Sequence, residues 1–257
     1  MAELTYRDAV ARGIAQEMAR DPDVVFLGED VAKAGGVFKT TVGLYEQFGE
    51  RRVRDCPISE QAILGAAMGA AMTGLKPIAE IMFSDFFAVC FDYIANEFAK
   101  SRYMSNGQLK CPLVVRTANG AGSRFGAQHS QSVENWAMMI PGLKVVAPST
   151  PRDVIGLLAA AVRDPDPVIF FEHKSLYPTK GEVPEGELDK WKERDPIKIY
   201  RERLQQFGIG EEVIAAIEAD VKRRVDEATE KCKAAPPPPL ELLTADVYAD
   251  GGFAWRN

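Results

Sequence analysis

The segment 55–75 most narrows the folds open to this chain, because it joins a short strand to a helix that is apolar on nearly every side. Ser59 is a good N-cap residue, and Glu60 then stands in the first helical turn, where the helix dipole favours a negative charge. Gly65 and Gly69 lower the helix propensity, which indicates a buried helix in very close contact with its neighbours. A carboxylate is thus predicted at the carboxyl end of a strand, where open α/β sheets hold their ligands. The alternative is that Glu60 only caps its own helix.

Strands and helices alternate along the first two thirds of the chain. This order predicts an α/β fold with a doubly wound parallel sheet and helices on both faces. Short apolar runs predict six strands, at residues 24–27, 52–55, 77–82, 112–117, 144–147 and 167–172. Besides the helix after Ser59, the patterns predict helices at residues 5–20, 44–48, 86–103, 134–139 and 151–163.

The composition is that of a soluble globular protein, with 46% hydrophobic and 26% charged residues. A net charge of −6 disfavours nucleic acid and anionic membranes as partners, and no apolar run is long enough to cross a bilayer. The first residues have no signal-peptide character, and the four cysteines lack metal-ligand spacing. We therefore expect a cytoplasmic protein with reduced thiols.

The composition changes near Tyr177, where a polar, proline-punctuated segment indicates a connector. A short helix from Pro196 to about Gly208 and a longer, mostly charged helix are predicted to follow it. We expect an α/β domain at residues 1–187 and a helical tail at residues 188–257. The long helix has a narrow apolar stripe, and the tail has three aromatic residues; both are expected to bury against another surface. These residues are Val213, Ile217, Val221 and Val225 of the stripe, and Tyr248, Phe253 and Trp255 of the tail.

The chain has only two histidines, and their contexts differ. His129 lies in a glycine-rich loop after a predicted strand, where its side chain can be exposed above the sheet edge and exchange protons near neutral pH. His173 closes the last predicted strand, and we interpret it as a structural polar residue. The glycine-rich loop is weak evidence for phosphate binding, because it neither opens a helix with a GxGxxG pattern nor precedes a Walker lysine.

Five sequence motifs carry a family resemblance. They are FLGEDV at residues 26–31, PISEQAILGAAMGAAMTGLKPIAEIMF from Pro57, AQHSQS at 127–132, PGLKVVAPSTPRD from Pro141 and RDPDPVIFFEHKSLY at 163–177. On these motifs, residues 1 to about 187 resemble the amino-terminal half of the β subunit of thiamine-diphosphate-dependent 2-oxo acid dehydrogenases. The pyruvate and acetoin dehydrogenase types are the most similar. The resemblance implies the pyrimidine-side domain of the thiamine-diphosphate-binding fold.

The resemblance also implies the roles of four residues. Glu60 would hydrogen-bond the ring nitrogen of the cofactor's aminopyrimidine and favour its imino tautomer, which takes a proton from the thiazolium carbon. Phe86 would stack on the aminopyrimidine, with Ile58 in contact beside it. His129 would lie near the reacting acyl group and the incoming lipoyl arm.

Two metal ions follow from the same resemblance. Magnesium would be held mainly by an α-type partner subunit, together with the diphosphate. A structural potassium ion would be held by carbonyl and side-chain oxygens. Its matching positions are Leu113, Ala161, Val162, Asp164 and Asp166.

The chain also departs from the family pattern. The second α/β domain of a full β subunit does not follow residue 187; instead, residues 194–204 and 246–257 resemble the carboxyl-terminal end of the α subunit. The α-subunit motif for diphosphate and magnesium is not reproduced by Asp250-Gly251-Gly252. We therefore expect half of a thiamine diphosphate site, completed by an α-type subunit or by self-association. The origin of the mixed tail stays open between natural fusion, truncation and engineering.

The expected substrate is a small 2-oxo acid or acetoin, and the expected acyl acceptor is the lipoyl domain of an acyltransferase. Without a partner, cofactor binding should be weak and activity negligible. The alternative is a non-catalytic relic that acts as an interface or binding module, which the absent second domain favours. A transketolase-like synthase shares the pyrimidine-side domain, but the segments at 127–132 and 195–204 fit it poorly.

Overall fold

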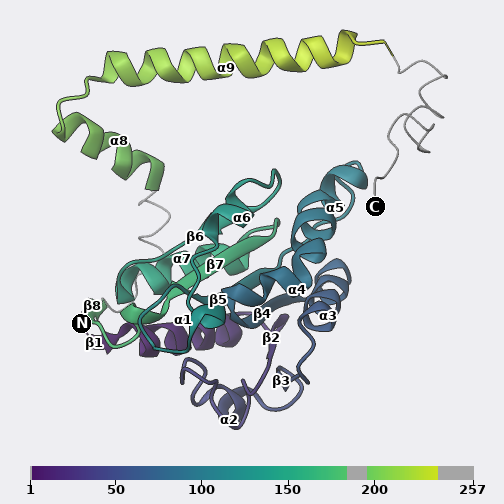
Figure 1. Ribbon diagram of the computed structural model, residues 1–257, viewed down its shortest axis with the longest axis vertical. Helices are drawn as coiled ribbons and strands as arrows, with labels where there is room; N and C mark the ends of the chain where they lie inside the picture. The colour runs from purple at the N-terminus through teal and green to yellow at the C-terminus, as the bar shows by residue number, and fades with distance from the viewer. Residues whose placement is uncertain (1, 184–195, 237–257) are drawn as a thin grey trace, which may run out of the picture. The chain divides into compact units, whose positions relative to one another are not determined.

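The computed structural model describes residues 2–183 and 196–236, and the chain divides into two compact units, residues 1–192 and 193–257. The first unit is an α/β domain and the second is helical (Figure 1). The domain boundary expected after residue 187 falls outside the described residues, as do the aromatic tail residues Tyr248, Phe253 and Trp255. We describe each unit by itself.

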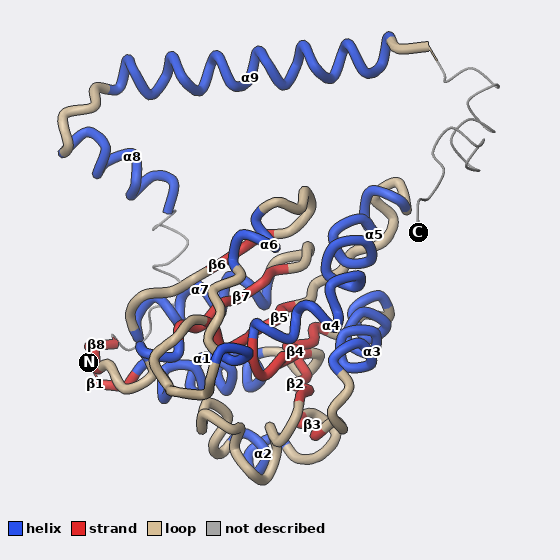
Figure 2. Tube along the Cα trace, viewed as in Figure 1, coloured by secondary structure: helices blue, strands red, loops and turns tan. Residues whose placement is uncertain are grey.

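The α/β unit is built on a six-stranded parallel sheet (Figure 2). All six predicted strands are present, so the expected α/β fold is confirmed. Along the sheet the order is β3-β2-β4-β5-β7-β6. The strands are β2 (Val24–Gly28), β3 (Val53–Asp55), β4 (Lys76–Phe83), β5 (Val114–Asn119), β6 (Lys144–Val146) and β7 (Val168–His173).

Helices cover both faces of this sheet, because successive strand residues point to opposite sides and both sides are apolar. One core cluster joins Phe26 and Phe170 to α1 (Tyr6–Arg20) and α7 (Pro151–Arg163). The other core cluster joins Ile81 and Phe171 to the helices of the opposite face. These are α3 (Glu60–Met72), α4 (Phe87–Asp92) and α6 (Glu134–Met138).

The N-terminal ends of α7 and α3 differ in their hydrogen bonds. Thr150 and Asp153 form a capping box at α7: the Thr150 hydroxyl accepts from the Asp153 amide at 3.1 Å, and the Asp153 carboxylate accepts from the Thr150 amide at 3.1 Å. At α3, Ser59 occupies the N-cap position as predicted, but its hydroxyl donates to the Pro57 carbonyl at 3.0 Å. The expectation that this hydroxyl caps the first turn is therefore wrong.

Helix α3 is buried on one side only, so the prediction of a wholly buried helix is wrong within this chain. Gly65 does lie in close contact, because an added Cβ would stand 2.8 Å from the hydroxyl oxygen of Tyr93. Ala62, Ala66 and Gly69 face outward and are exposed, and an added Cβ on Gly69 would meet nothing within 4 Å. The sheet and its helices cover one stripe of α3, and no other described element covers the opposite stripe.

The aromatic-rich helix predicted at 86–103 is three segments. Helix α4 leads into a π-helical turn, Tyr93–Phe98, and then into α5 (Ala99–Met104). Cys90 departs from helical geometry, with φ −120° and ψ 18°. A 3.6-residue apolar pattern does not distinguish such a wide turn from a regular helix.

A second, two-stranded sheet was not predicted from the sequence. It pairs β1 (Ala2–Thr5) with β8 (Lys180–Val183) in antiparallel register, so that Ala2 lies opposite Val183. Strand β8 falls in the segment expected to be a connector, because its polar residues carry no apolar signal. The sheet joins the two ends of the α/β unit.

The helical unit contains α8 (Pro196–Gln206) and α9 (Glu211–Ala234). Arg201 of α8 holds α9 by ion pairs with Glu211 and with Glu218, the latter at 2.8 Å. The predicted apolar stripe of α9 is exposed, with Val213, Ile217, Val221 and Val225 each between 51% and 59% accessible. Its burial against another surface stays a prediction. In the described parts of the chain, no helix is both long and apolar enough to cross a bilayer.

Candidate cofactor and active site

The carboxyl ends of five neighbouring strands, β3, β2, β4, β5 and β7, bring chemically active side chains to one edge of the sheet. Glu29 follows β2, Glu60 follows β3, Phe86 follows β4, and Lys174 follows β7. His129 lies in the loop after β5. Because the strands are parallel, their carboxyl ends meet at the same edge, which is where open α/β sheets bind ligands.

Phe86 and His129, which the sequence placed in the site, contact each other. Their ring centroids lie 5.2 Å apart at an interplanar angle of 81°. Both rings also contact Phe83, at 5.5 Å from Phe86 and 4.5 Å from His129. Phe86 and His129 are only half-buried, so an aromatic ligand can reach them.

The loop that carries His129 is fixed at one point by a carboxylate. Asp85 lies next to Phe86, and its Oδ1 accepts hydrogen bonds from the Gln131 amide at 3.1 Å and from the Gln131 side chain at 2.9 Å. The Gly120 amide donates to the Gln131 carbonyl at 2.9 Å. The loop is thus anchored two residues after His129.

Glu60 is buried, with 8% of its surface accessible, beside a second buried carboxylate. The pKa of Glu29 is raised by its burial and then by the negative charge of Glu60, while a hydrogen bond from the Ser59 amide opposes the shift. Burial and then the charge of Glu60 raise the pKa of the Cys90 thiol to about 12. Cys90 lies one turn after Phe86 and donates to its carbonyl at 3.5 Å. Helix α3, which begins at Glu60, and α4, which follows Phe86, pack in one core cluster, so the starts of these two helices carry Glu60 and Phe86.

Ile58, an expected cofactor contact, is exposed to solvent, with 84% of its surface accessible. His173 has local partners: its Nδ1 lies 2.7 Å from the Ser175 hydroxyl, and its ring fills the space that a Cβ on Gly120 would need. Gly120 has φ +77°, a backbone conformation that suits glycine. The placement of His173 fits a structural role.

The positions expected to hold potassium gather at the opposite, amino-terminal edge of the sheet. The Leu113 carbonyl accepts from the Val168 amide at 2.9 Å. The carboxylate of Asp164 pairs with Lys144 at 2.6 Å, and that of Asp166 pairs with Arg102 at 2.5 Å. Ala161 and Val162 lie in the last turn of α7. Because both carboxylates are paired, a cation here would depend on main-chain carbonyl oxygens.

Beyond these positions, the described residues contain no group of three or more His, Cys, Asp or Glu side chains arranged to hold a metal ion.

A buried charge cluster behind the site was missed by the sequence reasoning. Arg116 of β5 binds Glu172 of β7 through two hydrogen bonds of 2.7 and 2.6 Å, and it also pairs with Glu80 of β4. Tyr177 donates to Glu172 at 3.0 Å. Burial raises the pKa of Glu80, although the charge of Arg116 opposes this. The available signal was a charged residue inside each of three apolar strands.

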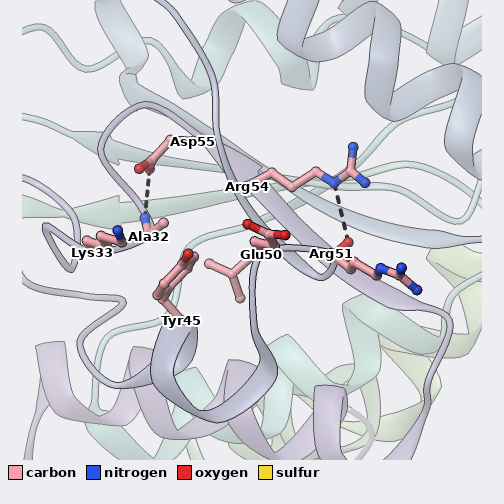
Figure 3. A pocket seen from close by; sticks show the side chains of 8 residues that line it. Ala32, Lys33, Tyr45, Glu50, Arg51, Arg54 and Asp55 are labelled. Carbon is pink, nitrogen blue, oxygen red and sulfur yellow. Dashed lines mark hydrogen bonds between the residues drawn. The ribbon is translucent and has the colours of Figure 1, made fainter.

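A surface cavity of about 510 Å³ lies at the sheet edge formed by β3 (Figure 3), and Phe83, Phe86 and His129 are not among its lining residues. Its lining includes Lys33, Tyr45 and Glu50, and Asp55 accepts from the Ala32 amide at 2.7 Å. It contains none of the residues expected to bind cofactor. This cavity is therefore not part of the candidate cofactor site.

The fold and the acidic and aromatic groups at its carboxyl edge define an α/β ligand-binding domain with an edge site. The chain belongs to the family "Transketolase, pyrimidine binding domain", whose model matches residues 2–180.

Similar proteins place the chain among the β subunits of thiamine-diphosphate-dependent 2-oxo acid dehydrogenases, an oxidoreductase family, and confirm the resemblance. The 2-oxoisovalerate dehydrogenase subunit beta of Bacillus subtilis is 48% identical over 234 residues, covering 83% of this chain and 72% of that protein. The acetoin:2,6-dichlorophenolindophenol oxidoreductase subunit beta of Cupriavidus necator is 52% identical over 194 residues, with 72% and 57% covered. The pyruvate dehydrogenase E1 component subunit beta of Rhizobium meliloti is 50% identical over 184 residues, with 72% and 40% covered.

The chain thus covers 57% of the length of the Cupriavidus necator protein and 40% of the length of the Rhizobium meliloti protein. A solved structure described as "Split gene transketolase, inactive beta4 tetramer" matches with a TM-score of 0.54 at 21% identity, over 67% of this chain and 52% of that chain. That likeness supports the fold.

Proposed function

We propose that this chain supplies the aminopyrimidine side of a thiamine diphosphate site in the decarboxylating component of a 2-oxo acid or acetoin dehydrogenase. The observation that carries the proposal is the buried Glu60 carboxylate at the same edge of the sheet as the half-buried Phe86–His129 pair. A carboxylate and an open aromatic face are the groups that an aminopyrimidine ring needs, so the residues fit this cofactor. When bound, thiamine diphosphate supplies the carbon nucleophile that attacks the substrate carbonyl.

In this proposal Glu60 holds a proton at the aminopyrimidine ring nitrogen. Its position at the first residue of α3 fixes the direction of the carboxylate, and burial excludes water from the hydrogen bond.

Phe86 orients the ring by stacking, and His129 exchanges a proton with the acyl group during its transfer to a lipoyl domain. The half-buried position of His129 supports this role, since the group must meet a second substrate that arrives from solution. Ile58 is exposed and would be covered only when cofactor or partner is present.

The diphosphate and its magnesium ion would be held by an α-type partner, or by a second copy of this chain. The exposed alanine and glycine face of α3 supports such a partner. A groove of about 370 Å³ lies beside it, lined by Ala66, Ala70 and Leu75 together with the edge of β2 and β3. An apolar, closely approachable surface of this kind is typical of subunit contacts.

A potassium ion, if bound, would stabilise the amino-terminal edge through the main-chain oxygens of Leu113, Ala161 and Val162, with Asp164 and Asp166 nearby. It would take no part in the chemistry, because this edge lies at the other ends of the strands from Glu60 and His129.

Reconstitution with an α-type subunit tests the proposal. The mixture should release CO₂ from pyruvate or a branched 2-oxo acid, or cleave acetoin, and the Glu60→Gln mixture should not. If the wild-type mixture binds the partner but turns over none of these substrates, the chain is a non-catalytic interface module. If it instead transfers ketol groups between sugars, it is a transketolase-like synthase.

A further inference from the structure

Lys174 is a buried cation that the proposed chemistry does not use. It lies directly after β7 and exposes only 3% of its surface. Its ammonium nitrogen has no hydrogen-bond partner within the described structure and lies 5.1 Å from the centroid of the Phe83 ring. Burial lowers the pKa of Lys174, and the charge of Asp85 partly opposes this. An uncompensated buried ammonium is costly, so its presence requires a partner or a role.

Asp85 is the matching anion. It exposes 6% of its surface, and its Oδ1 is occupied by the two hydrogen bonds from Gln131. Its Oδ2 is buried and has no partner among the described residues. Two buried groups of opposite charge thus interact electrostatically without direct contact, and each has an unused hydrogen-bonding atom.

Two routes lead from this charge pair to His129. Through Asp85, the pair holds Gln131 and so the loop two residues beyond His129. The second route runs through Phe83, because the Lys174 ammonium and the His129 imidazole both contact the Phe83 ring. The loss of either charge would therefore shift the His129 side chain.

We propose that Lys174 and Asp85 are positioning residues, a buried charge pair that fixes the His129 loop and holds the imidazole against Phe83 and Phe86. The proposal deepens the function proposed above, but its first test does not depend on that function.

The first test is NMR of the histidine ring protons in the full chain, which has only two histidines. His173→Gln assigns the signals. The His129 signals should show ring-current shifts from Phe83 and Phe86, and Lys174→Met and Asp85→Ala should reduce those shifts. Lys180→Met is the matched control, because the Lys180 side chain is 64% exposed and pairs with Glu3 at the surface. Unchanged His129 signals in both site variants would overturn the proposal.

The second test compares stability with activity. Lys174→Met keeps the length of the side chain but leaves the Asp85 carboxylate buried without its cation, so the midpoint of thermal unfolding should fall, and activity is compared at a temperature where both proteins are fully folded. In an active assembly, transfer of the acyl group to lipoyl should fall about 10- to 100-fold from the misplaced imidazole. The Michaelis constant for the 2-oxo acid should not change, and Lys174→Arg should restore part of the rate.

Three outcomes of this test would count against the positioning role. Equal losses of lipoyl transfer and of turnover with an artificial electron acceptor in Lys174→Met would make the pair structural. A raised Michaelis constant with an unchanged turnover number would make the ammonium a binding group for the substrate carboxylate. An unchanged rate of lipoyl transfer would leave His129 independent of the pair. If the wild-type assembly binds no thiamine diphosphate, the proposed function fails while the NMR test still decides this inference.

Discussion

Glu29 and Glu60 follow adjacent strands and are buried to the same degree, and the pKa of Glu29 is raised by its burial and then by the charge of Glu60. The carboxylates thus interact at the carboxyl edge, although 31 positions separate them in the sequence. Because β2 and β3 are neighbours in the sheet, their ends meet here. A buried pair of this kind costs stability when both groups are ionised, and such costs concentrate at functional sites.

Glu29→Gln should stabilise the protein at neutral pH. In the folded state the pKa of Glu29 is raised above its ordinary value of 4.5, so between these two values the folded state binds more protons than the unfolded state. Wild-type stability therefore falls as pH rises through that window, and the variant avoids this loss. Urea unfolding from pH 4 to 8 should show a gain at pH 7 that vanishes below pH 4.5. The control is Glu50→Gln, at an exposed position, which should show no such pattern.

Arg116→Met should destabilise the α/β unit severely, because it leaves Glu80 and Glu172 buried without their cation. Breaking a buried charge network by removing one partner typically costs about 3–5 kcal/mol. Arg102→Met removes a partly exposed pair with Asp166 and should cost ~0–1 kcal/mol in the same urea titration. Equal losses for the two variants would contradict the assignment of Arg116 as the central ion of the buried cluster.

Glu60→Gln and His129→Ala should affect different steps in an active assembly. Glu60→Gln should slow decarboxylation and every later step together, by ~100- to 10,000-fold. His129→Ala should reduce transfer to lipoyl more than it reduces turnover with an artificial electron acceptor, which bypasses that transfer. If His129→Ala lowers both rates equally and weakens cofactor binding as well, the histidine only holds its loop.

The exposed stripe on α9 should bury in an assembly. Val221→Glu places a charge in the middle of the stripe and should shift light-scattering mass towards the monomer, either of this chain alone or of its complex with an α-type subunit. Lys222→Glu, next to it on the charged side of the helix, is the control. A wild-type chain that scatters as a compact monomer under all conditions, with or without partner, would contradict this expectation.

The sequence predicted the sheet well because each strand is a short apolar run between turn signals, and α7 because it opens with a proline. The sequence pattern did not reveal interactions between distant segments. The pairing of β1 with β8 joins residues about 180 positions apart, and neither strand is apolar enough to be recognised. The burial of α3 was predicted wrongly because alanine and glycine occur both in protein cores and on surfaces that contact a partner subunit.

The candidate site was predicted in the same uneven way. Glu60 and His129 were singled out by their places in the sequence, while Phe86 and the roles of all three came from the family resemblance. The structure puts all three at one edge. The groups around them, Glu29 and Lys174, were missed because their neighbours lie on adjacent strands, which spacing along the chain does not report. A lysine directly after an apolar strand looks exposed in the sequence, whereas here it is buried.

Titration calorimetry with thiamine diphosphate and magnesium tests the central claim most directly, namely that this chain holds the pyrimidine half of a shared site. The pure chain should bind weakly, an equimolar mixture with an α-type subunit should bind tightly, and the mixture made with Glu60→Gln should bind less tightly than wild type. Tight binding to the pure monomeric chain, or equal binding by the wild-type and Glu60→Gln mixtures, would contradict the account.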